Sequence, residues 1–96
     1  MEAQRPIEGS TRFKLAPAAT RLLGSDLLVN VGGATAPVQR LMGTGPELWH
    51  CFARGLTVAE AAAHLSTLEG APADAEADVV AFGTSLVRAH LAKPVW

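Results

Sequence analysis

The sequence predicts an α+β fold in which short strands come first and three helices follow. Residues 1–45 hold the apolar and alternating runs typical of strands, and two capping boxes and one long amphipathic segment come after them. A length of 96 residues with 49% hydrophobic and 18% charged residues fits one globular domain. We expect a flexible lead-in at residues 1–11, the domain at residues 12–92 and a tail at residues 93–96.

The strands are expected in the first half of the chain. Arg12–Leu15 alternates polar and apolar side chains, which favours a short first strand. Residues 27–31 are apolar and β-branched, two glycines follow them as a turn signal, and residues 35–42 resume the strand pattern. The two runs predict a hairpin. Its second strand contains Pro37, which has no backbone donor, so we place this strand at the edge of the sheet.

Three helices are expected after the strands, and the starts of the first two are marked by capping boxes. Thr44 and Glu47 have capping-box spacing, and so do Thr57 and Glu60, which predicts the start of a helix at each place. A longer third helix is predicted over residues 74–91. Acidic residues lie near its start, where their negative charge interacts favourably with the positive end of the helix dipole.

The third helix has an apolar arc of about 180°, which is wider than one core contact requires. One edge carries Val79, Phe82 and Leu86, and we expect it to face the core. The other edge carries four residues that are available for a second surface: Val80, Gly83, Thr84 and Val87. In the alternative interpretation both edges are core, and Gly83 permits close packing.

The sequence gives little support for catalysis or for binding of a metal or cofactor. His50 and Cys51 are adjacent, so on a helix they point about 100° apart and cannot form a nucleophile–base pair. Cys51 lies beside apolar residues, which favours a buried, inert thiol. The three histidines lack metal-ligand spacing, and no glycine-rich phosphate loop occurs. We therefore expect a protein that is not an enzyme and that uses no metal and no cofactor.

Charge and hydropathy narrow the classes of partner and the compartment. The net charge is −1, and the strand half is mildly basic whereas the helical half is acidic. This balance gives no electrostatic case for nucleic acid or for an anionic membrane. The single cysteine cannot form an internal disulfide, and the sequence shows neither a signal peptide nor a membrane-spanning run. A cytoplasmic protein is the expectation.

Three segments carry a resemblance to a known family. They read Leu-Met-Gly-Thr-Gly-Pro-Glu-Leu-Trp at residues 41–49, Gly-Leu-Thr-Val-Ala-Glu-Ala-Ala-Ala-His-Leu at residues 55–65, and Asp-Val-Val-Ala-Phe-Gly-Thr-Ser-Leu-Val-Arg-Ala-His-Leu at residues 78–91. In this order, after a hairpin strand, they resemble the PqqD-like family of precursor-peptide recognition elements. The resemblance spans residues 12–92 and consists of apolar and capping positions.

The resemblance implies a winged-helix-like fold with a three-stranded antiparallel sheet followed by three helices. It also implies a function, which is to bind the leader segment of a ribosomally synthesised precursor peptide and present it to a modifying enzyme. That enzyme would be a radical SAM protein, a protease or a cyclase, in pyrroloquinoline quinone biosynthesis or in another pathway to a modified ribosomal peptide. In such proteins the leader adds as a strand beside the third strand, in the groove between that strand and the third helix.

The expected peptide-binding residues follow from this resemblance. On the strand they are Pro37, Val38, Gln39, Arg40, Leu41 and Met42, and on the helix they are Val80, Gly83, Thr84 and Val87. An edge strand that can accept a further strand, and a helix with surplus apolar surface, fit this expectation independently. Arg40, Lys14 and Arg12 are candidates to meet acidic leader residues.

The sequence leaves two alternative functions. A winged-helix DNA-binding domain is disfavoured, because the third helix opens with Asp74, Glu76 and Asp78, and carboxylates repel the DNA backbone. An adaptor subunit of another complex is the second alternative. The exposed edge strand also leaves open a homodimer that pairs through residues 37–42 and competes with the peptide.

Overall fold

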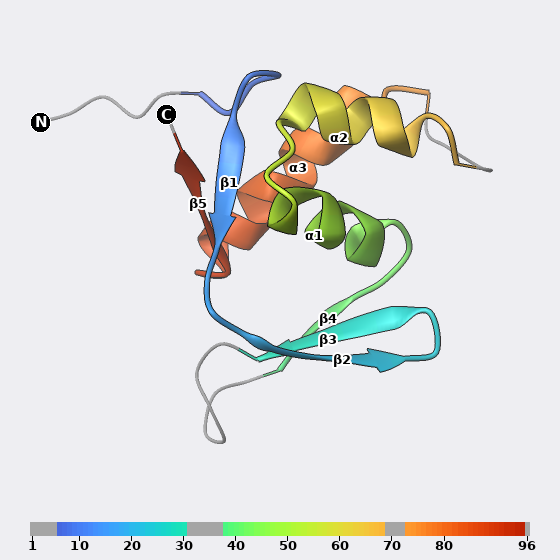
Figure 1. Cartoon of the computed structure of the whole chain (residues 1–96), viewed down its shortest axis with the longest axis vertical. Helices are drawn as coiled ribbons and strands as arrows, with labels where there is room; N and C mark the ends of the chain where they lie inside the picture. The colour runs from blue at the N-terminus through green and yellow to red at the C-terminus, as the bar shows by residue number, and fades with distance from the viewer. Residues whose placement is uncertain (1–5, 31–37, 69–72, 96) are drawn as a thin grey trace, which may run out of the picture.

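The computed structural model describes residues 6–30, 38–68 and 73–95 of the chain. The described elements are, in order, β1 (Arg12–Leu15), β2 (Ala19–Leu23), β3 (Asp26–Asn30), β4 (Gln39–Leu41), α1 (Gly45–Ala53), α2 (Val58–Leu65), α3 (Ala75–Arg88) and β5 (Ala92–Val95). The α+β class predicted from the sequence is confirmed. Figure 1 shows the helices packed on one another, with a three-stranded sheet projecting from them.

The three-stranded sheet is antiparallel, in the order β2-β3-β4. The predicted hairpin is confirmed in its pairing, because Leu27 lies opposite Leu41 and Val29 lies opposite Gln39. These four residues share the face that is turned toward α1, where Leu27 and Val29 are buried. The proposed glycine turn at residues 32–33 lies outside the described residues.

The first strand of this sheet, β2, was not predicted. Pro17 interrupts the pattern, but the chain resumes extended structure at Ala19 and pairs with β3 along its whole length. Gly24 and Ser25 connect the two strands, and Gly24 has a φ of 62°. Glycine at the first position of such a short loop is typical of a type II′ hairpin turn. This glycine was the available signal for β2.

Residues 93–95, which were predicted as part of a tail, belong to a strand, Ala92–Val95. This strand, β5, pairs antiparallel with β1, so Phe13 lies opposite Pro94. The predicted strand at Arg12–Leu15 exists, but it belongs to this separate two-stranded sheet and not to the sheet of the hairpin. Proline is tolerated in β5 because β1 is the only strand beside it in the described part of the chain.

The lead-in is attached to the domain from Gly9 onward. The carbonyl groups of Gly9 and Thr11 accept hydrogen bonds of 2.9 Å from the backbone N–H groups of Ala59 and Val58, respectively. Thr11 is 2% exposed. These bonds satisfy N–H groups at the start of α2 that have no partner within the helix.

The second of the two predicted capping boxes is confirmed. Thr57 Oγ1 accepts a hydrogen bond of 3.1 Å from the backbone N–H of Glu60, and Glu60 Oε1 accepts one of 2.9 Å from the backbone N–H of Thr57. The first box is wrong, because Thr44 adopts a helical conformation and makes no side-chain cap. Glu47 pairs with His64 instead, with 2.6 Å between Oε1 and Nε2, which joins α1 to α2.

Helix α3 starts where the sequence predicts, after Asp74, but it ends at Arg88 and not at residue 91. The side chain of Asp74 accepts a hydrogen bond of 3.1 Å from the backbone N–H of Ala77, which caps the helix. The helix ends at Arg88 because His90 has a φ of 61°, which no helical residue adopts. This turn sends the chain back along α3 as β5, so the helix is terminated well before Pro94.

The core lies where α1, α2 and α3 meet β1 and β3. Phe52 is its central aromatic residue, 4.7 Å from the ring of Phe13 and 6.2 Å from the ring of Phe82 between centroids. The predicted core edge of α3 is confirmed for Val79 and Leu86, which are buried, whereas Phe82 is only partly buried.

The two threonines that start α1 and α2 give a matched test of capping. Thr57→Ala should lower the free energy of unfolding by about 1 kcal/mol, because it removes the acceptor of the capping bond. Thr44→Ala should change it by much less, since Thr44 makes no such bond. Urea denaturation of both variants measures the difference. Equal losses would contradict the assignment.

The capping box also predicts a pH dependence. The hydrogen bonds with Thr57, first from its backbone and then from its side chain, together with the charge of Arg12, hold the pKa of Glu60 below its ordinary value. The carboxylate therefore stabilises the fold above about pH 4.3, and this contribution is lost as the pH falls through the lowered pKa. Glu60→Gln should be less stable than the parent at pH 7, and the difference should shrink at pH 3. A difference independent of pH would contradict this cause.

Candidate functional site

The outer edge of β4 is the part of the predicted site that the structure supports best. In the order β2-β3-β4, only β3 borders β4 among the described residues. At its two ends Val38 is 53% exposed and Met42 is 64% exposed. Gln39 and Leu41 are partly buried between them, and Arg40 is exposed. Pro37, the first residue of the predicted strand, lies outside the described residues.

Gly83 does not open a groove, and this part of the predicted site is wrong. It is buried, and a Cβ built on it would lie 2.5 Å from Cζ and 2.8 Å from Cε2 of Phe13. The ring of Phe13 therefore covers the space that a peptide side chain was expected to occupy. Of the two interpretations of this glycine, close packing is the one that the structure supports.

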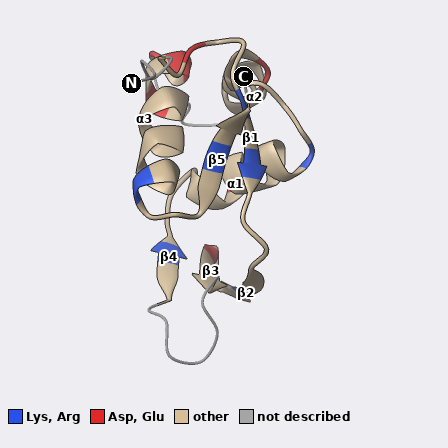
Figure 2. Ribbon diagram, turned by 90° about the vertical axis from the view of Figure 1, so that its left-hand side faces the viewer, with Lys and Arg blue, Asp and Glu red and all other residues tan. Residues whose placement is uncertain are grey.

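The other predicted helix residues lie on the same side of α3 as Gly83. Val80 and Val87 are three and four residues from Gly83, so helical geometry aligns them with it. Both are partly buried and pack against the core. Thr84 donates its hydroxyl to the carbonyl of Val80 at 2.8 Å, so the helix itself uses this donor. This face meets β1 and β5, which Figure 2 shows beside α3, whereas β4 lies below the end of the helix.

A different residue of α3, Phe82, shares a neighbour with the end of β4. The connection runs through Gly45 at the start of α1, where a built Cβ would lie 3.1 Å from Cβ of Leu41 and 3.3 Å from Cε1 of Phe82. Ala89 is seven residues beyond Phe82, so it lies about 20° from it around the helix, and it is also partly buried. On the helix side, Phe82 is therefore the candidate in place of the four predicted residues.

Sequence reasoning missed Phe82 because it assigned this residue to the core edge of the helix. The signal that could have found it is Gly45, which has no side chain where β4, α1 and α3 come together. Helical periodicity shows which side chains share a face. It does not show which neighbour covers that face.

Of the three basic residues expected to meet acidic leader residues, only Arg40 lies on β4. Arg40 donates from Nε to Oδ2 of Asp26 at 2.8 Å, which fixes its guanidinium on the outer face of the sheet, although the side chain stays 54% exposed. Arg12 donates from Nε to the carbonyl of Gly55 at 3.2 Å, and it lies with Lys14 on β1 and not at β4. In Figure 2 the basic positions of β4 and of the C-terminal end of α3 lie toward one end of the molecule, and most acidic positions lie toward the other, although β3, which contains Asp26, carries an acidic position beside β4.

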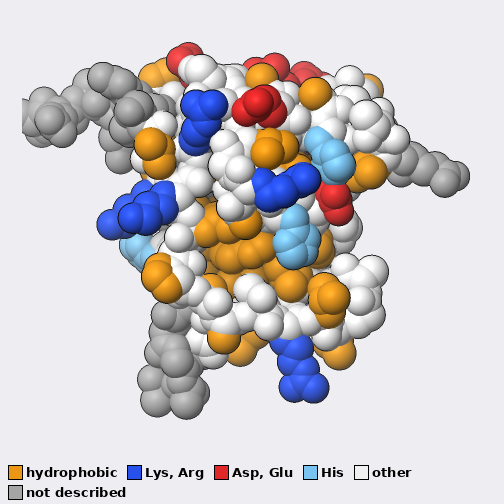
Figure 3. Space-filling view, viewed as in Figure 1, with side chains coloured by type: hydrophobic (Ala, Val, Ile, Leu, Met, Phe, Trp, Pro, Cys, Tyr) orange, Lys and Arg blue, Asp and Glu red, His pale blue; other side chains and the backbone are white. Residues whose placement is uncertain are grey.

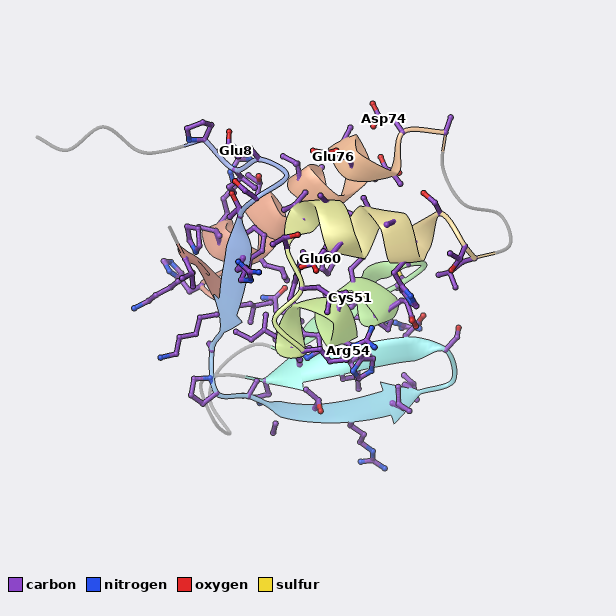
Figure 4. The ribbon with its side chains drawn as sticks, turned by 45° about the horizontal axis from the view of Figure 1, so that its top comes forward. Glu8, Cys51, Arg54, Glu60, Asp74 and Glu76 are labelled. Carbon is purple, nitrogen blue, oxygen red and sulfur yellow. The ribbon has the colours of Figure 1, made fainter. Side chains whose placement is uncertain are left out.

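The groups that could carry chemistry are dispersed. Cys51 is fully buried, and Nη2 of Arg54 lies 3.7 Å from its Sγ (Figure 4). No group of three or more His, Cys, Asp or Glu side chains suited to a metal ion occurs in the described part of the chain. Within the same residues, no helix has the length and apolar character to cross a membrane.

Comparison of the chain with models of known protein families, with curated proteins and with solved structures finds no match. The candidate site therefore rests on its own geometry, which consists of an open strand edge, two exposed apolar side chains at its ends and a partly buried phenylalanine beside it.

The contact between Gly83 and Phe13 makes a testable prediction. Alanine is the better helix former by about 1 kcal/mol, so propensity alone would make Gly83→Ala stabilising. We expect instead a loss of about 1–3 kcal/mol, because the added methyl group overlaps the ring of Phe13. Thermal and urea denaturation give the sign. The loss should be smaller in a Phe13→Leu background, and a stabilised Gly83→Ala would contradict the contact.

Proposed function

We propose that this chain binds an extended peptide by β-strand addition at the open edge of β4. The observation that supports this most is that β4 has no second neighbour among the described residues. Leu41 at its end and Phe82 of α3 both lie close to Gly45. A strand added there would run beside β4 and pass the partly exposed side of α3. The site is thus built from one strand edge and one helix.

Strand addition suits a site of this composition. Main-chain hydrogen bonds along the edge give affinity that depends little on sequence, and alternate side chains of the peptide give specificity. Val38 and Met42 offer apolar contact at the two ends of β4, and Phe82 offers it from the helix. Because the peptide would cover these apolar groups, their exposure in the free protein is accounted for.

The resemblance to the PqqD-like family supplies the identity of the peptide. In that family the ligand is the leader segment of a ribosomally made precursor, and the complex is presented to an enzyme that modifies the core of the peptide. The order of a three-stranded sheet followed by three helices, with an edge strand just before the first helix, supports the same function here. We propose leader recognition as the function and a peptide-modifying enzyme as the second partner.

Calorimetric titration with leader peptides tests this proposal. The probes are synthetic peptides that cover the N-terminal half of each short precursor-like open reading frame next to this gene. Each peptide is compared with a scrambled version. Saturable one-to-one binding of one unscrambled peptide is the expected result. Failure of every peptide to bind at high concentration would overturn leader recognition.

Variants of the exposed residues locate the site. Met42→Asp and Val38→Asp should each weaken peptide binding about tenfold or more, or about 1.4 kcal/mol, because a charge replaces an apolar contact at the strand edge. Val95→Asp is the matched control, since Val95 is 50% exposed at the end of β5, away from β4. Circular dichroism verifies that all three fold. Equal weakening by the control would place the peptide elsewhere.

A further inference from the structure

The strand at the other edge of the three-stranded sheet, β2, is unusually exposed. All five of its residues are exposed, and β3 is its only neighbour in the described part of the chain. Leu22 is 65% exposed and Leu23 is 53% exposed. Proteins usually protect an edge strand with charges, a proline or a bulge, whereas this strand carries Arg21 as its single charge.

The two leucines lie on opposite faces of the sheet. Leu22 is paired with Leu27, whose side chain is buried under α1, and Leu23 is paired with Asp26, whose carboxylate binds Arg40 on the outer face. A partner that covered one face would leave one leucine in water. A strand added at the edge covers the flanks of both, because its side chains also alternate between the two faces.

Apolar side chains also gather on the body of the protein above β2. Figure 3, which has the same view as Figure 1, shows them between the helices and the three-stranded sheet, on the face of the molecule where β2 lies in front. A strand pair of five residues buries less than the roughly 1,200 Å² of a standard interface. A partner with its own apolar surface on the same side of the sheet would supply the rest.

We infer that β2 is the self-association edge of this protein and that its partner is a second copy of the chain. Antiparallel pairing of β2 with β2 of the second copy about a two-fold axis through Leu22 puts the two Leu22 side chains opposite each other. Arg21 then faces Leu23 of the other copy, so the two arginines do not meet. Centring the axis on Arg21 would put like charges directly opposite, which is unfavourable.

The two-fold axis also accounts for the apolar surface above β2. With the axis perpendicular to the sheet, the sheet faces that are turned toward α1 lie on the same side in both copies. Each copy therefore turns the same apolar surface toward the other. The β4 edges lie at the two outer ends of the combined sheet and stay free. This inference therefore does not depend on the proposed peptide site, and either can fail without the other.

Sedimentation velocity over a range of protein concentrations tests the association. The weight-average mass should rise from 10.0 kDa toward twice that value as concentration increases. Leu22→Glu should abolish the rise, since it places two carboxylates across the axis. Val38→Glu, at the other edge and with 53% exposure, should leave the rise unchanged. A parent protein that stays monomeric at the highest concentration, or a rise that only Val38→Glu removes, would overturn the inference.

Oxidative cross-linking tests the register. Residues directly opposite in an antiparallel pair have Cα atoms about 4.5–5.5 Å apart, which a disulfide can bridge. Leu22→Cys should therefore cross-link to its own copy under mild oxidation. In the same register, Cys residues introduced by Leu23→Cys lie about 8 Å apart and should not. The native Cys51 is fully buried and serves as a common background. Equal cross-linking of both variants would contradict the register.

Discussion

The contact between the ring of Phe13 and the backbone of Gly83 determines how the rest of the structure is arranged. It brings β1 closer to α3 than any other residue at position 83 would allow, since a Cβ there would lie 2.5 Å from the ring. Phe13 also packs on Phe52 of α1, so one side chain joins the first strand to two helices. β5 then pairs with β1 and completes the cover over this face of α3. The apolar surplus of α3, for which the sequence left two interpretations open, is used in this contact.

Because β1 belongs to the helical body, the remaining strands form a separate sheet that contacts the body mainly through β3 and α1. Leu27 and Val29 of the middle strand are buried, while β2 is exposed on both faces. The sheet therefore has two open edges with different surroundings within the described residues. Leu41 at the end of β4 and Phe82 of α3 both lie close to Gly45, whereas the β2 edge lies beside an apolar part of the surface.

The sequence predicted those features that depend on local interactions. The capping box at Thr57, the start of α3 at its acidic residues and the hairpin of β3 and β4 all arise from residues close together in the chain. β2 was missed because a strand exposed on both faces has no apolar alternation to detect. β5 was missed because its pairing with β1 joins residues from opposite ends of the domain. The strand residues of the candidate site belong to a hairpin, which local sequence signals indicate. The helix residues were wrong, because periodicity could not show that Phe13 covers Gly83.

The pairing of β1 with β5 has a consequence for how the chain folds as it is synthesised. The hairpins of the three-stranded sheet and the contact between α1 and α2 close short segments, so they can form early. Arg12 and Val95 lie at opposite ends of the domain, and closing that long loop carries a larger entropy cost. Until β5 has left the ribosome, β1 has no strand partner and the apolar face of α3 is incompletely covered. The nascent chain is thus vulnerable to aggregation until β5 emerges.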